Sequence, residues 1–390
     1  IKKMINFFSQ QNKMLEDIFM EAITKGVFPG AAIAVAHGVA SNRNIEVKCF
    51  GYTGYQGDEN EPVEPETFYD LASLTKPLAT LPALLVLLAR GELGFDDKLE
   101  DLLQRKVSRE KRAIRLRHLL GHSAGLPAHL PFFEHWAPQS ALEQREGIRE
   151  KVVAEIMARP LLFTPGTATL YSDLGYILAG MVVEKRSGDD LAEFIEKNIY
   201  APLGLSNQLF FNPHNHPRQV VYAPGEYCSW RQRLLKGEVG DENCALLGGV
   251  AGHAGLFGNI RGVAGLTSYL LDIWQNQAPE KLILIESDDL RHCLTKQQIK
   301  NDTTWALGMD TPSARGSSGG DLLSAASVGH LGYAGTSFWI DPHRELVVVL
   351  LTNRVHPSRF NDQIKRFRPL FHNNLIRVLD SCNLSGRSQT

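Results

Sequence analysis

Cysteine is scarce in this sequence, and the few cysteines form no recognisable pattern. They are far apart, none belongs to a C-x-x-C pair, and their number is odd: Cys49, Cys228, Cys244, Cys293 and Cys382. Such a set argues against a disulfide framework and against a cysteine-based zinc site. Because disulfides are rare in reducing compartments, we predict a cytoplasmic protein, or a periplasmic one if an N-terminal signal has been removed.

Charge of one sign and long hydrophobic runs are also lacking. With a net charge of −2 and no long basic stretch, the chain has no electrostatic footprint for a nucleic acid. Its longest apolar run, residues 81–89, is too short to span a bilayer and contains Pro82, so we predict a buried helix and no membrane span. Residues 1–10 lack the sustained apolar centre of a signal peptide.

Motifs for metals and nucleotides are missing as well. The sequence has no H-E-x-x-H, and its glycine-rich segment 248–255 lacks the lysine of a phosphate-binding loop. The histidines are scattered through loops and apolar segments, without a close ligand set. We therefore predict no metal and no cofactor, and we keep His253 as a candidate for lining a cleft.

The chain does have strand signals at both ends and helical spacing between them. Residues 30–36 and 44–50 predict one hairpin, and residues 337–341 and 345–351 predict another. Apolar spacing predicts helices around them, at residues 11–26, 150–158, 176–186, 191–199, beyond 262 and 361–379. These patterns predict an α+β fold with an antiparallel sheet flanked by helices.

The positions of these elements also predict two structural units. Residues 1–80 and 260–390 are expected to form a discontinuous α/β domain, because their strands come from the two ends of the chain. Residues 81–259 are expected to form a mostly helical inserted domain. An active site would then lie between the two.

The segment Ser73-Leu74-Thr75-Lys76, next to the long apolar run, is the most informative one. A hydroxyl and an amine three residues apart lie on one face of a helix, near its positive end if Ser73 opens it. Serine needs a neighbouring base to act as a nucleophile, and a lysine in a partly dry pocket can accept that proton. Taken alone, the segment is better explained as an N-cap serine beside a solvated lysine.

Two later segments, Tyr171-Ser172-Asp173 and Gly329-His330-Leu331-Gly332-Tyr333, complete an ordered set with it. Together the three segments resemble the S-x-x-K, Y-x-N and K-T-G or H-x-G motifs of the serine β-lactamase and penicillin-binding-protein superfamily. The resemblance is to its class C-like branch, which includes class C β-lactamases, D-alanyl-D-alanine carboxypeptidases and lactamase-like esterases. It spans residues 30–357 and implies a β-lactamase/transpeptidase-like fold.

The resemblance implies that Ser73 is the nucleophile and that Lys76 and Tyr171 move protons. Either the amine or the phenolate could accept the serine proton, and groups this close titrate as a unit, so the choice between them stays open. Asp173 stands where the family usually has asparagine. A carboxylate there is expected to hold Lys76 and raise the pKa of the lysine, which shifts the base role toward Tyr171, whose pKa an adjacent cation would lower.

His330 and Leu331 stand where many members of that family have lysine and threonine, which help to hold a substrate carboxylate. A mostly neutral imidazole and an apolar side chain hold an anion less firmly, which favours esters, amides or uncharged acyl donors. Gly332 permits a close approach of backbone and substrate. By resemblance, the backbone N–H groups of Tyr333 and Ser73 would form the oxyanion hole.

Gly121-His122-Ser123-Ala124-Gly125 offers a rival nucleophile. It fits G-x-S-x-G, the nucleophile elbow of α/β-hydrolases, which requires a strand before it and a helix after it. Residues 114–120 instead have the pattern of a short helix, and the alternating β/α order of that fold is absent. Ser73 is therefore the preferred nucleophile.

We accordingly predict a serine hydrolase that acts through an acyl-enzyme on an ester or amide of a small acyl compound. The first alternative is a β-lactamase or D-alanyl-D-alanine carboxypeptidase acting on β-lactams or peptidoglycan peptides. The second is a non-catalytic binding protein on the same fold, which has no reason to keep Ser73, Lys76 and Tyr171 together. The expected partner is a small-molecule or peptidoglycan-derived substrate, and the oligomeric state is left open.

Overall fold

A computed structural model describes the chain apart from residues 1–12, 56–59, 137–141, 213–219, 300–302 and 388–390. Its centre is a five-stranded antiparallel sheet in the order β2-β1-β10-β9-β8. Both predicted hairpins are confirmed, and one further strand extends the sheet at its edge. The strands are β1 (Gly30–His37), β2 (Asn44–Gly51), β8 (Val328–Leu331), β9 (Ser337–Asp341) and β10 (Leu346–Thr352).

Alternate residues of the central strands contribute to two separate cores, because successive side chains of a strand point to opposite faces. One core contains Ala31, Ile33, Val35, Val348 and Leu350. The other contains Ala32, Ala34, Ala36, Val347, Val349 and Leu351. Both faces of the sheet are therefore covered, which explains why β1 and β10 are almost continuously apolar in sequence.

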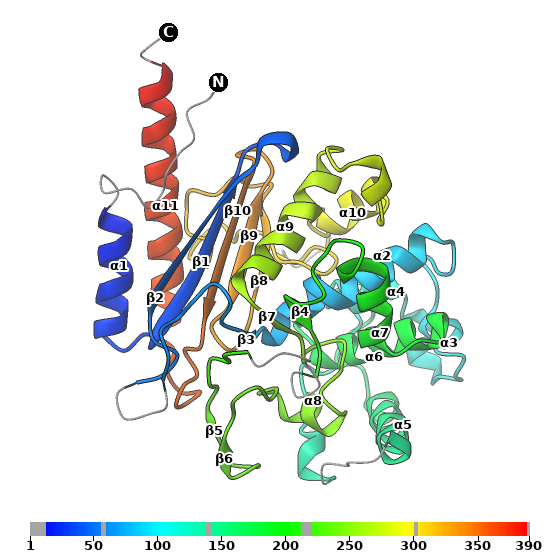
Figure 1. Ribbon diagram of the computed structural model, residues 1–390. Coiled ribbons are helices and arrows are strands. Elements are labelled where there is room, and N and C mark those ends of the chain that lie inside the picture. Colours follow the sequence, from blue (N-terminus) through cyan, green and yellow to red (C-terminus); the bar gives the residue numbers. More distant parts are fainter. Residues whose placement is uncertain (1–12, 56–59, 137–141, 213–219, 300–302, 388–390) are drawn as a thin grey trace.

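Helices cover the two faces of the sheet (Figure 1). On one face lie α1 (Lys13–Thr24) and α11 (Ile364–Arg387), and on the other lies α9 (Ile260–Trp274). The Phe19 ring of α1 stacks on Phe50 of the sheet, with 4.5 Å between ring centroids. The helices predicted at both ends of the chain and after residue 262 are thus present.

A mostly helical region packs on the α9 side of the sheet (Figure 1). Its helices are α2 (Leu81–Ala89), α3 (Leu99–Leu102), α4 (Leu116–Leu120), α5 (Leu142–Ala158), α6 (Asp173–Ser187), α7 (Leu191–Ile195), α8 (Glu242–Leu246) and α10 (Ser287–Leu294). Short strands join it, namely β3 (Tyr69–Asp70), β4 (Leu209–Phe210), β5 (Tyr227–Cys228), β6 (Arg233–Leu234) and β7 (Phe257–Gly258). One buried cluster joins this region to the sheet, so the division at residues 80 and 260 stays a prediction.

The helix with the S-x-x-K motif combines three geometries. A 3₁₀ turn (Ala72–Leu74) is followed by a π-helical turn (Lys76–Thr80) and then by α2 (Leu81–Ala89). Pro77 and Pro82 lie within it, and proline removes a backbone donor and crowds the preceding turn of a helix. Pro77 lies in the π turn and Pro82 follows it; such wide turns are frequent at functional sites.

This same helix is the most apolar one that the structure describes. The window Ala72–Ala89 is long and apolar enough to cross a membrane by length and composition, but 78% of it is buried inside the protein. The core helix of a globular protein passes the same test. The prediction of a buried helix therefore holds for this segment.

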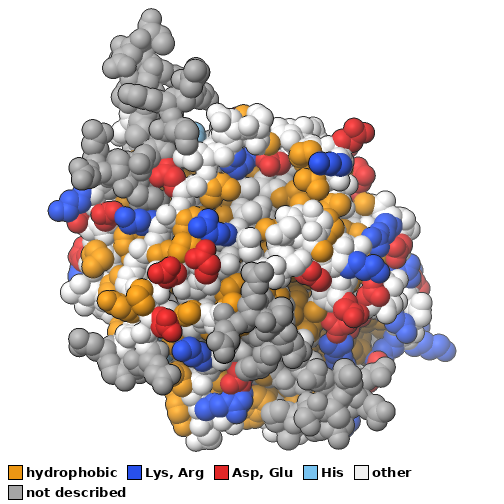
Figure 2. Space-filling model, viewed as in Figure 1, with side chains coloured by type: hydrophobic (Ala, Val, Ile, Leu, Met, Phe, Trp, Pro, Cys, Tyr) orange, Lys and Arg blue, Asp and Glu red, His pale blue; other side chains and the backbone are white. Residues whose placement is uncertain are grey.

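The surface carries charges of both signs. Figure 2 shows Lys and Arg side chains interspersed with Asp and Glu over the visible face. This distribution agrees with the small net charge of −2.

Candidate active site

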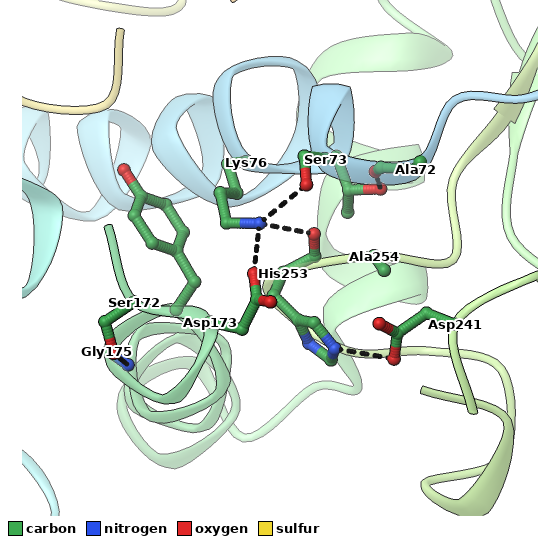
Figure 3. A network of polar contacts seen from close by, with 12 residues as sticks. Ala72, Ser73, Lys76, Ser172, Asp173, Gly175, Asp241, His253 and Ala254 are labelled. Carbon is green, nitrogen blue, oxygen red and sulfur yellow. Dashed lines mark hydrogen bonds and ion pairs between the residues drawn. The ribbon is translucent and has the colours of Figure 1, made fainter. Parts of the chain in front are cut away.

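Ser73, Lys76 and Asp173 meet between the serine helix and the start of α6 (Figure 3). Lys76 Nζ donates a hydrogen bond to Ser73 Oγ at 3.1 Å and lies 2.8 Å from Asp173 Oδ1. It also donates to the backbone oxygen of His253 at 2.9 Å. An ammonium group has three N–H bonds, so each of them has an oxygen within reach.

The start of α6 holds Asp173 toward Lys76. Ser172 is the N-cap of this helix, and its hydroxyl accepts a hydrogen bond from the Gly175 N–H at 3.3 Å. The Ser172 N–H in turn donates to His122 Nδ1 at 3.1 Å. Asp173 therefore occupies the first turn of a helix, where a carboxylate is favoured by the helix dipole.

Burial and charge together set the protonation of Lys76. Its side chain is fully buried, whereas that of Asp173 is 20% exposed. Burial by itself lowers the pKa of Lys76, but Asp173 and then Tyr171 raise it, and the net direction is upward. Lys76 is therefore an ammonium at neutral pH, in an ion pair with Asp173.

Tyr171 lies against the same ammonium, with 5.0 Å between Lys76 Nζ and the centroid of its ring. Burial raises the pKa of Tyr171; Lys76 lowers it and Asp173 raises it, so the net direction is upward. The prediction that Lys76 would favour the phenolate is therefore wrong in direction, because desolvation of the phenol and the nearby carboxylate outweigh the cation. Tyr171 keeps its proton at neutral pH.

A cavity of about 510 Å³ opens in front of these groups. Its lining includes Ser73, Tyr171, Asp173, Tyr333 and His253. Carboxylates are prominent in it, contributed by Asp70, Glu134, Asp173, Glu226, Glu238, Asp241 and Glu242. The cavity is thus wide enough for a small substrate and is predominantly acidic.

One guanidinium, that of Arg359, also lines the cavity. It forms ion pairs with both Glu226 and Glu242. Glu226 is only 7% exposed, whereas the Arg359 side chain is 34% exposed, so this ion pair is partly shielded from water. Among the described residues that line the cavity, no lysine or arginine is left to receive a substrate carboxylate.

The turn between β8 and β9 packs on the serine helix. Gly332 donates its N–H to the Thr336 oxygen at 2.7 Å, and the Thr336 hydroxyl donates to the Leu71 oxygen at 3.2 Å. Tyr333, which is 56% exposed, lines the same cavity as Ser73. The predicted oxyanion segment and the predicted nucleophile are therefore brought together, and their roles remain predictions.

Gly332→Ala tests this packing. A Cβ at this position would lie 2.0 Å from Thr336 Oγ1 and 2.6 Å from the Leu71 oxygen, so the β8–β9 turn must move away from the serine helix. We expect kcat to fall by about 10²-fold, the effect of losing one oxyanion donor. The matched control is Gly147→Ala in α5, where an added Cβ meets nothing within 4 Å. An unchanged kcat for Gly332→Ala would contradict this account.

His330 has a different position from the one predicted. The sequence suggested that it shapes the substrate side, but His330 is not among the residues that line the cavity. Its ring is buried near Tyr171 and Trp305, with centroid distances of 6.2 and 5.7 Å, because the β8 backbone turns this side chain inward. Burial, and then the Lys76 ammonium, lower the pKa of His330 to about 3. The imidazole is therefore neutral, as expected, but it lies in the protein interior.

The structure around Ser123 excludes it as the nucleophile. Helix α4, and not a strand, precedes Ser123. The Ser123 side chain is buried, its hydroxyl lies 3.5 Å from Gln297 Oε1, and it does not line the cavity. A nucleophile elbow requires the strand–serine–helix order and an exposed hydroxyl.

Asp241 is a cavity residue that the sequence did not indicate. Asp241 Oδ1 lies 2.9 Å from His253 Nε2 (Figure 3). Asp241 also caps α8 by accepting a hydrogen bond from the Cys244 N–H at 2.7 Å. This pair fixes the loop whose backbone oxygen accepts from Lys76. The glycines around His253 were a sequence signal that this loop packs closely on its neighbours. A Cβ on Gly252 would lie 2.1 Å from the Tyr176 oxygen. Asp241 carried no comparable signal.

A buried lysine between a serine and a tyrosine, beside a five-stranded antiparallel sheet, defines a serine hydrolase of the acyl-enzyme class. The chain belongs to the beta-lactamase family, whose model matches residues 15–370.

Among its relatives is the N-acetylmuramyl-L-alanine amidase of Bacillus subtilis, 31% identical over 90% of this chain and 82% of the relative. An Escherichia coli protein with the provisional name D-alanyl-D-alanine carboxypeptidase is 32% identical over 74% of this chain and 70% of its own length.

Solved structures share the fold at lower identity. The octameric penicillin-binding protein homologue of Pyrococcus abyssi has a TM-score of 0.68 at 22% identity, covering 91% of this chain and 75% of that one. EstCE1, a hydrolase with promiscuous acyltransferase activity, has a TM-score of 0.70 at 20% identity. The match covers 93% of this chain and 97% of that one. The predicted β-lactamase/transpeptidase-like fold is thereby confirmed.

Proposed function

We propose that this enzyme hydrolyses an ester or amide of a small acyl compound that has no carboxylate beside the reacting carbonyl. The observation that carries this proposal is the charge of the cavity. Its lining includes several carboxylates, and its guanidinium, that of Arg359, is already paired with two of them. A substrate carboxylate would lose water there without gaining a cation, which is costly.

Ser73, which lines the cavity, is the nucleophile of the proposed reaction. Ser73 attacks the carbonyl carbon, the leaving group departs and an acyl-enzyme forms; water then attacks the same carbon and frees Ser73. The proposed oxyanion donors are the backbone N–H groups of Tyr333 and Ser73, two residues that both line the cavity. The names of two relatives and neighbours, an amidase and a hydrolase with acyltransferase activity, support this reaction class.

A pair of matched esters tests the proposal. We expect kcat/KM for p-nitrophenyl butyrate to exceed that for the p-nitrophenyl monoester of succinate by about tenfold or more, since 1.4 kcal/mol of charge repulsion corresponds to a factor of ten. Glu134→Gln removes one exposed carboxylate from the cavity lining and should narrow the difference. Equal rates for both esters would contradict the proposal.

A D-alanyl-D-alanine peptidase or β-lactamase is the second candidate, favoured by the names of relatives and of a penicillin-binding-protein neighbour. Release of D-alanine from a D-alanyl-D-alanine peptide, at a kcat/KM above that of any neutral ester, would establish it instead. Rapid turnover of a penicillin would indicate a β-lactamase. A protein that neither hydrolyses these compounds nor reacts with a fluorophosphonate would be a binding protein.

A further inference from the structure

We propose that Asp173 is the terminal proton acceptor of the acylation step and receives the Ser73 proton through Lys76. The proposal rests on the proposed acyl-enzyme function. It gives Asp173 a role beyond holding Lys76 in place, one that the amide of an asparagine at this position could not perform, because an amide oxygen does not take up a proton at neutral pH.

The contacts of Lys76 lead to this inference. Its Nζ faces Ser73 Oγ, Asp173 Oδ1 and the His253 oxygen at 3.1, 2.8 and 2.9 Å. An ammonium nitrogen has four bonds and therefore no lone pair to offer Ser73. Lys76 can therefore act as a base only after it has released a proton to one of these oxygens, and only the Asp173 carboxylate can take one.

The other titratable groups around this ion pair are poor acceptors. They are Tyr171, Tyr176, His122, His330 and His253. Burial raises the pKa of both tyrosines, so each phenol already holds its proton. Burial lowers the pKa of His122 and His330, which opposes protonation of either ring. His253 faces Lys76 with its backbone oxygen, while its ring contacts Asp241.

The step is balanced in protons and electrons. One N–H bond of Lys76 breaks as an O–H bond forms on Asp173 Oδ1. The freed lone pair on Nζ takes the Ser73 proton while Oγ forms its bond to the carbonyl carbon and the carbonyl π electrons move to the oxyanion. Lys76 is an ammonium again, and Asp173 is a neutral acid. When the oxyanion reforms the carbonyl, the leaving group departs with a proton that Asp173 supplies back through Lys76.

Asp173→Asn tests the proposal, with the pH dependence of acylation as the readout. The amide oxygen can still accept from Lys76, so a positioning role survives the substitution. We expect the second-order rate of Ser73 labelling by a fluorophosphonate to fall about 10²-fold at pH 7, the lower end of general-base contributions. Between about pH 7 and 9 the rate should rise about tenfold per pH unit, because the variant must first lose the Lys76 proton to solvent. The wild-type rate should stay nearly level over that range.

Two controls make the result decisive. Asp96→Asn removes a carboxylate that is 65% exposed and does not line the cavity, and should leave the labelling rate unchanged. Thermal unfolding of Asp173→Asn checks that the fold is retained. A profile for Asp173→Asn that is parallel to the wild-type one, with a rate within threefold of it, would overturn the proposal. Failure of wild-type Ser73 to react at all would overturn the proposed function instead.

Discussion

Ser73→Ala is expected to abolish both turnover and covalent labelling. Ser73 Oγ accepts a hydrogen bond from the buried Lys76 ammonium and lies on the wall of the cavity. Without this oxygen no acyl-enzyme can form, and the remaining rate reflects only binding and oxyanion stabilisation. Loss of a serine nucleophile in such a site lowers kcat by about 10⁴-fold or more. Intact-mass spectrometry after treatment with a fluorophosphonate measures the loss directly.

The matched control for this experiment is Ser123→Ala. Ser123 belongs to the rival motif but is 1% exposed and lies outside the cavity lining. Its substitution should leave both the adduct and kcat in place. An adduct that persists in Ser73→Ala and maps to another residue would contradict the assignment of the nucleophile.

Lys76→Met is the second substitution with a large expected effect. Lys76 is fully buried, and its removal leaves Ser73 without its base and Asp173 without its counter-ion. We expect kcat to fall by about 10³-fold or more, within the range of general acid–base contributions. The free energy of unfolding should drop by about 1–3 kcal/mol, because an uncompensated carboxylate remains beside an apolar side chain. Steady-state kinetics and urea denaturation measure the two effects.

Lys111→Met separates the loss of activity from the loss of stability, because Lys111 is also buried, at 1% exposure, but does not line the cavity. Its Nζ donates to the Arg159 oxygen at 2.5 Å and pairs with Glu110. This control should lose stability and keep its kcat. A Lys76→Met variant that retained most of its kcat would assign the base role to Tyr171 instead.

Much of the fold could be predicted because the signals are local. A strand shows its pattern over a few residues, and the turn at Pro342 marked the second hairpin. The edge strand β8 (Val328–Leu331) has a weaker pattern and was not among the predicted strands. The π turn Lys76–Thr80 was not predicted, since its form depends on how the helix packs.

The site was predicted less completely than the fold. Ser73, Lys76, Tyr171 and Asp173 do come together, and Tyr333 reaches the cavity. His330, Asp241 and the pairing of Arg359 were not anticipated in their observed positions. Which way a side chain points, and which partner it finds across the chain, depends on packing that no short segment encodes.

By itself, the sequence determined that a serine and a lysine share a helical face and that two hairpins build the sheet, because i, i+3 spacing and strand alternation are local properties. Only the tertiary structure decided that Tyr171 keeps its proton and that His330 turns inward. These outcomes depend on desolvation and on charges brought close from distant parts of the chain, and both arise only when the whole protein packs.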